Sequence, residues 1–109
     1  MRLEFVVEGS KGDHYLATFE REGTNLNAFC TCQAGENGLY CKHRFALMDG
    51  DVSSLISGNV NDVERLKTMI QGTDIESAYT RVQDATKAFD AAKKELGTAK
   101  KALAKAMCR

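Results

Sequence analysis

Four residues that bind zinc well lie within fourteen positions of this chain, namely Cys30, Cys32, Cys41 and His43. They form two pairs with one residue inside each pair, and a short polar loop joins the pairs. Three thiolates and one imidazole complete the tetrahedral shell of a structural zinc site, which leaves no open position for water or a substrate. The spacing therefore predicts a closed Zn²⁺ site and favours a binding module over an enzyme.

Two other interpretations of these residues stay open on the sequence alone. The cysteines could be core residues beside an incidental histidine, or Cys30 and Cys32 could form a redox pair, although so small a ring is strained. A secretory signal is not predicted, because Glu4 stands where an apolar segment should begin and the apolar run after it is short. We therefore expect a cytoplasmic protein whose cysteines stay reduced and bind metal.

The segments that would position these ligands show strand and helix patterns. Apolar and polar residues alternate over residues 2–8, 15–20 and 26–30, which predicts three antiparallel strands joined by turns. Cys30 and Cys32 come at the end of the third strand, where side chains two residues apart point to the same side. A loop over residues 34–38 and a short helix over 41–48 follow. The positive end of that helix favours a thiolate at Cys41, with His43 in the first turn.

The motif in this setting resembles the SWIM-type zinc finger, whose pattern is C-x-C-x(n)-C-x-H on a ββα unit. The likeness rests on Cys-Thr-Cys, eight residues and Cys-Lys-His, after a hairpin and before an apolar helix, over roughly residues 14–49. It implies that Cys30, Cys32, Cys41 and His43 are the zinc ligands. Family members include domains attached to helicase-like remodelling ATPases, Mutator-type transposases and recombination proteins. The resemblance thus implies a link to DNA metabolism, although residues 50–109 lie outside it and contain no helicase or transposase domain.

The second half of the chain predicts helices. After a helix over residues 61–71, the segment 73–109 has no proline and a single glycine, which predicts a helix of about 34 residues, about 50 Å long. Its apolar residues recur at alternating steps of four and three, as in a heptad seam: Ala85, Phe89, Ala92, Leu96, Ala99, Leu103 and Ala106. We expect Phe89, Leu96 and Leu103 to contact another helix, from residues 61–71, from a second copy or from another protein.

These elements together predict an α+β fold. A small antiparallel three-stranded sheet carries a zinc-bound ββα finger, and a C-terminal helical hairpin with one long helix follows. We expect a SWIM-like zinc-binding domain over residues 1–59 and a helical, coiled-coil-like region over residues 60–109.

The charge distribution argues against a protein that is basic overall. The formal net charge is zero, so no global signature of nucleic-acid binding exists. Basic residues nevertheless gather beside the motif and at the C-terminus, and the candidate nucleic-acid contacts are Lys42, Arg44, Lys100, Lys101, Lys105 and Arg109. No apolar run is long enough to span a bilayer, and no phosphate-binding glycine motif occurs. We therefore expect neither a membrane nor a small-molecule substrate among the partners.

Two functions fit these observations. The first is a non-catalytic zinc-binding adaptor linked to DNA metabolism, whose long helix self-associates or docks on a protein partner. The alternative is a nucleic-acid-binding accessory protein that uses Lys42, Arg44 and the basic C-terminus. An enzyme is disfavoured because His43 is a predicted ligand and His14 lies at a predicted turn, which leaves no general base beside a nucleophile.

Overall fold

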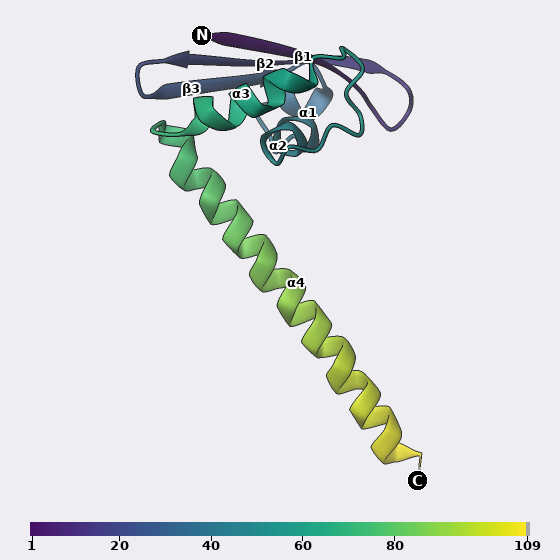
Figure 1. Ribbon diagram of the computed structural model, residues 1–109. Helices are drawn as coiled ribbons and strands as arrows, with labels where there is room; N and C mark the ends of the chain where they lie inside the picture. The colour runs from purple at the N-terminus through teal and green to yellow at the C-terminus, as the bar shows by residue number, and fades with distance from the viewer. Residues whose placement is uncertain (109) are drawn as a thin grey trace. The chain divides into compact units, whose positions relative to one another are not determined.

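The computed structural model describes residues 1–108, and its contacts divide the chain into two compact units (Figure 1). The first unit, Met1–Glu76, holds a sheet and three short helices. The second unit, Ser77–Arg109, contains most of the long helix α4 (Asp74–Met107). The contacts place α3 (Val60–Ile70) in the first unit, where this helix buries its apolar side. The division into a zinc-binding domain over residues 1–59 and a helical region over residues 60–109 stays a prediction.

The sheet consists of β1 (Arg2–Glu8), β2 (His14–Glu22) and β3 (Asn25–Cys30), paired antiparallel in the order β1-β2-β3 (Figure 1). Leu3 lies opposite Phe19 and Phe5 opposite Ala17, and all four side chains are buried. The rings of Phe5 and Phe19 meet edge to face at 5.9 Å. The alternation seen in the sequence therefore marks the buried face of the sheet correctly, and the predicted α+β fold with a three-stranded antiparallel sheet is confirmed.

Helix α3 contacts α2 (Lys42–Met48), and Arg21 of β2 joins the end of α3 to the sheet. The apolar stripe of α3 is buried, and comprises Val63, Leu66, Met69 and Ile70. Arg21 of β2 donates hydrogen bonds to the carbonyl oxygens of Met69 (3.1 Å) and Gln71 (2.8 Å) at the end of the helix. These bonds satisfy carbonyl groups that have no partner inside a helix. The pairing of α3 with α4 as a hairpin stays a prediction.

The outer edge of β1 is covered by the segment that precedes α3. The N–H of Glu8 donates to Ser54 O (2.8 Å), and the N–H of Ile56 donates to Val6 O (2.9 Å). Ser57 Oγ accepts a hydrogen bond from the N–H of Val6 at 3.1 Å. This segment therefore follows β1 closely, as an irregular partner of the strand.

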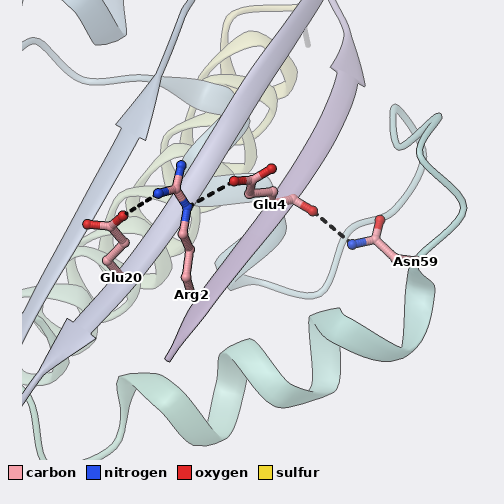
Figure 2. A network of polar contacts seen from close by, with 4 residues as sticks. All are labelled: Arg2, Glu4, Glu20 and Asn59. Carbon is pink, nitrogen blue, oxygen red and sulfur yellow. Dashed lines mark hydrogen bonds and ion pairs between the residues drawn. The ribbon is translucent and has the colours of Figure 1, made fainter.

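A polar network on β1 and β2 includes a hydrogen bond from Asn59, the residue that precedes α3 (Figure 2). Arg2 lies between two carboxylates, 2.9 Å from Glu4 Oε1 and 3.0 Å from Glu20 Oε1. The side-chain amide of Asn59 donates to the backbone oxygen of Glu4 at 2.8 Å. Since the ion pairs are exposed, they add little stability, and the bond from Asn59 fixes the chain where α3 begins.

Two short helices follow the sheet and border the site. The first, α1 (Gln33–Glu36), is a single helical turn where the sequence predicted a loop. The second, α2 (Lys42–Met48), is the predicted short helix, and it buries Leu47 and Met48. Both helices contact β3, the strand that ends in Cys30.

The long helix α4 begins at a residue that is attached to the sheet. The Asp74 carboxylate accepts a hydrogen bond from the N–H of Leu26 (3.0 Å), and the N–H of Asp74 donates to Thr24 O (2.9 Å). None of the 34 residues of α4 is buried. Among the described helices, none combines the length and the hydropathy that a membrane crossing requires. The long C-terminal helix predicted from the sequence is confirmed.

Candidate metal centre

The junction of β3 with α1 and the start of α2 position the four predicted ligands. Cys30 ends β3 and Cys32 caps the N-terminus of α1, while Cys41 caps α2 and His43 lies in the first turn of that helix. Thr31, between the first two cysteines, exchanges two hydrogen bonds with Leu16 of β2, at 3.0 and 3.1 Å. These bonds keep the chain extended between Cys30 and Cys32, so both side chains face the same side.

The ligand atoms converge on one point. Cys32 Sγ lies 3.3 Å from Cys41 Sγ, and His43 Nδ1 lies 3.8 Å from Cys30 Sγ and 3.6 Å from Cys41 Sγ. All four atoms lie within 4.8 Å of one another, and all four residues are buried. A tetrahedral zinc with ordinary bond lengths separates two sulfurs by about 3.8 Å and a sulfur from a nitrogen by about 3.5 Å. The group therefore has the dimensions of a zinc shell, and a disulfide is excluded at these distances.

The imidazole of His43 presents Nδ1 to the thiols. Its other nitrogen, Nε2, is buried and has no hydrogen-bond partner among the described residues. The ring of Tyr15 packs against the imidazole with 5.2 Å between ring centroids. In a neutral ring one nitrogen carries the proton and the other offers a lone pair. Nδ1 is thus the nitrogen placed to bind a metal, with the proton on Nε2.

The surroundings of the ligands shift their protonation in different directions. Burial raises the pKa of the Cys30 thiol to about 12, and the thiols of Cys32 and Cys41 act in the same direction. Burial also opposes ionisation of Cys41, but hydrogen bonds from the N–H of Arg44 and from the neighbouring thiols outweigh it and lower the pKa of Cys41. Burial and the charge of Lys42 lower the pKa of His43, which favours the neutral, metal-binding imidazole. A divalent cation must therefore displace the proton of Cys30, and binding releases protons.

Gly35 is a component of the site that the sequence did not reveal. Its N–H donates a hydrogen bond to Cys32 Sγ at 3.3 Å, which holds the side chain of Cys32 in place. A Cβ atom on Gly35 would lie 2.5 Å from the backbone oxygen of Cys30 and 2.8 Å from the Cβ of Cys30. Only glycine therefore fits between the two ligands in this backbone. The sequence showed the glycine in a supposed loop, without the close approach that requires it.

Arg44, predicted as a phosphate contact, binds backbone oxygens in the structure. Its two terminal nitrogens donate to the backbone oxygens of Ala28 on β3 and Leu39 in the α1–α2 loop, each at 2.8 Å. Its Nε is buried. Arg44 therefore joins α2, β3 and the loop between the two ligand pairs. Lys42, on the other side of His43, is exposed.

Substitution of Arg44 by lysine tests this structural role. A lysine keeps the charge but cannot span two carbonyl oxygens with a planar fork. We expect Arg44→Lys to lower the free energy of unfolding of the zinc-loaded chain by about 1.5–3 kcal/mol, measured by urea denaturation. Lys42→Met is the matched control and is expected to change it by less than about 0.5 kcal/mol. Equal stability of Arg44→Lys and the unsubstituted chain would contradict the structural role.

The remaining predicted contacts within the described residues lie on α4. Lys100, Lys101 and Lys105 are exposed, and Arg109 lies outside the described residues. Phe89, Leu96 and Leu103 are also exposed, with 66%, 54% and 60% of their surface accessible. These residues belong to the second unit and Lys42 to the first.

A comparison with protein families identifies the segment around the cluster. Residues 16–48 match the family model of the SWIM zinc finger, and the match contains both ligand pairs. These residues form a SWIM zinc finger. The resemblance seen in the sequence is confirmed, and the finger supplies a Cys₃His group able to coordinate a metal ion, consistent with zinc. Comparisons with curated proteins and with solved structures gave no match.

With zinc bound, the four protein ligands of the SWIM finger would occupy a tetrahedral shell. The metal would act as a structural cross-link, with its positive charge balanced by the thiolates. Other residues position the ligands: Gly35 and Thr31 hold the cysteine pair in place, and the ring of Tyr15 packs against the imidazole of His43.

Proposed function

We propose that this protein is a non-catalytic, zinc-folded interaction module whose helix α4 docks on another polypeptide. The observation that carries the proposal is the exposed apolar stripe of α4. Phe89, Leu96 and Leu103 stand one heptad apart on a helix that buries none of its residues. Burying a large apolar side chain contributes about 1.5–3 kcal/mol, so covering this stripe gives a strong drive for association.

The cluster supports the non-catalytic part of the proposal. Four protein ligands fill the tetrahedral shell of a zinc ion, so a substrate has no open coordination position. SWIM zinc fingers are in general binding modules. The further link to DNA metabolism rests on the resemblance to fingers attached to remodelling ATPases, transposases and recombination proteins.

Sedimentation velocity of the zinc-loaded chain tests the docking surface. We expect a species larger than the monomer at micromolar concentration, and a monomer for the double variant with Phe89→Glu and Leu96→Glu. Lys87→Glu with Lys94→Glu is the matched control, since these exposed residues lie on the opposite face of α4. A chain that stays monomeric at high concentration would refute self-association and restrict the proposal to a different protein partner.

A nucleic-acid-binding function is the second candidate, favoured by the exposed lysines of α4 and by exposed Lys42. Arg44 no longer supports it, because both of its terminal nitrogens bind backbone oxygens. Contacts with phosphates predict affinity for DNA or RNA that falls steeply with salt, in fluorescence anisotropy over a salt series. Absence of binding at low salt would refute this candidate.

A further inference from the structure

We infer that the occupant of the α4 stripe is α4 of a second copy, in antiparallel orientation, with each large apolar residue facing an alanine. This inference rests on the proposed function of α4 as a docking helix. It adds the identity of the partner, the direction of the pairing and the register.

The stripe of α4 is divided by side-chain size into two repeating positions. One position repeats every seventh residue from Val82 to Leu103 and always holds a large apolar side chain. A second position repeats every seventh residue from Ala78 to Ala106 and always holds alanine. The helix therefore presents a regular alternation of large and small residues along a single face.

This alternation fits one direction of pairing much better than the other. A parallel pair in register sets equal positions against each other, so layers of two large side chains would alternate with layers of two alanines. The large layers would hold the helices apart and leave voids at the alanines, which close-packed interfaces avoid. An antiparallel pair sets each large residue against an alanine, so every layer has the same thickness and the two helices approach evenly.

The charges of α4 point in the same direction independently. Between residues 74 and 92 the helix carries four acidic and two basic side chains, whereas between residues 93 and 108 it carries five lysines and one glutamate. An antiparallel pair brings the acidic half of each helix beside the basic half of the other. A parallel pair would bring the lysines of both copies together, and like charges held close repel.

The inferred register is the one that gives the two α4 helices their longest overlap while each large residue faces an alanine. With residues 78 and 103 opposite each other, Phe89 faces Ala92 of the second copy and Leu96 faces Ala85. Val82 then faces Ala99, and Leu103 faces Ala78. Pairing thus buries four large residues of each helix. Three of them, Phe89, Leu96 and Leu103, are more than half exposed in the single chain.

Distances between spin labels on three outward positions of the zinc-loaded full chain test the inference. The labels are attached to native Cys108 and, in a Cys108→Ser background, to Lys94→Cys and Lys101→Cys. In the inferred register, the two labels of a pair are offset along the axis by about 10 Å at 94, 30 Å at 101 and 50 Å at 108. The expected result is a separation that increases from position 94 to 108. One zinc per chain after labelling confirms that the buried cysteines were protected.

Two outcomes would overturn the inference in different ways. Equal separations at the three positions would show a parallel pair, which removes the inference but leaves the proposed docking function intact. No measurable separation, with a monomer in sedimentation, would exclude a second copy as the occupant and leave only a different protein.

The variant Ala92→Leu provides a second test, because its effect on the dissociation constant has opposite signs in an antiparallel and a parallel pair. In the antiparallel pair Ala92 faces Phe89, so Ala92→Leu overfills that layer and should raise the dissociation constant at least about tenfold. In a parallel pair Ala92 faces Ala92, and leucine would fill a void and strengthen association. Tighter association of Ala92→Leu would therefore contradict the inference.

Discussion

Replacement of Cys41 by alanine is expected to unfold the first unit of this protein while α4 keeps much of its helical signal. Cys41 Sγ lies 3.3 Å from Cys32 Sγ and 3.6 Å from His43 Nδ1, so its loss opens the cluster. A structural zinc contributes about 10–16 kcal/mol of apparent binding energy in zinc-finger peptides, which exceeds the stability of a typical small domain. The measurements are zinc content by mass spectrometry and circular dichroism in the near and far ultraviolet.

Cys108→Ala is the control for this variant. Cys108 is an exposed free cysteine that takes no part in the cluster, so its removal should leave both zinc content and folding unchanged. An unchanged zinc stoichiometry in Cys41→Ala would show that the ligand assignment is wrong. Chelation of zinc from the unsubstituted chain should reproduce the unfolding of the first unit.

Gly35→Ala is expected to weaken the zinc site although glycine binds no metal. The added Cβ would lie 2.5 Å from the backbone oxygen of Cys30, so the α1 turn or the end of β3 must shift. Such overpacking costs about 1–3 kcal/mol, and the shift also weakens the hydrogen bond from the N–H of residue 35 to Cys32 Sγ. We expect a lower midpoint in urea and a reduced zinc affinity in competition with a chromophoric chelator.

Gly97→Ala is the matched control, because a Cβ at Gly97 meets no atom within 4 Å. Alanine there should leave zinc affinity unchanged and favour the helix by about 1 kcal/mol. If Gly35→Ala bound zinc as tightly as Gly97→Ala, the close approach between α1 and Cys30 would not limit the site.

The ligands and the strands could be predicted because both depend on local spacing. Cys30 and Cys32 are two residues apart on an extended chain, and Cys41 and His43 lie at the start of one helix. The burial of Leu3 and Phe5 follows from alternation along β1. In these cases a few neighbouring residues determine the structure.

Other features depend on parts of the chain that meet only after folding. Arg44 stands beside a ligand and has the pattern of a surface charge, but its partners are carbonyl groups at Ala28 and Leu39. Residues 34–38, which include Gly35 and Gly38, were predicted as a loop, yet Cys32 Sγ accepts a hydrogen bond from the N–H of Gly35 and closes the turn α1. A sequence pattern cannot predict hydrogen bonds of this kind, because their acceptors are backbone oxygens and a thiol brought close only by folding.

The segment that follows β1 has a consequence for the behaviour of the protein in concentrated solution. An open edge of a sheet offers unpaired N–H and C=O groups to strands of other molecules, which leads to aggregation. Along β1 these groups at Val6 and Glu8 are already bonded to Ser54, Ile56 and Ser57. A foreign strand would have to displace this segment first, so the chain protects that edge of its sheet from strand addition with its own residues.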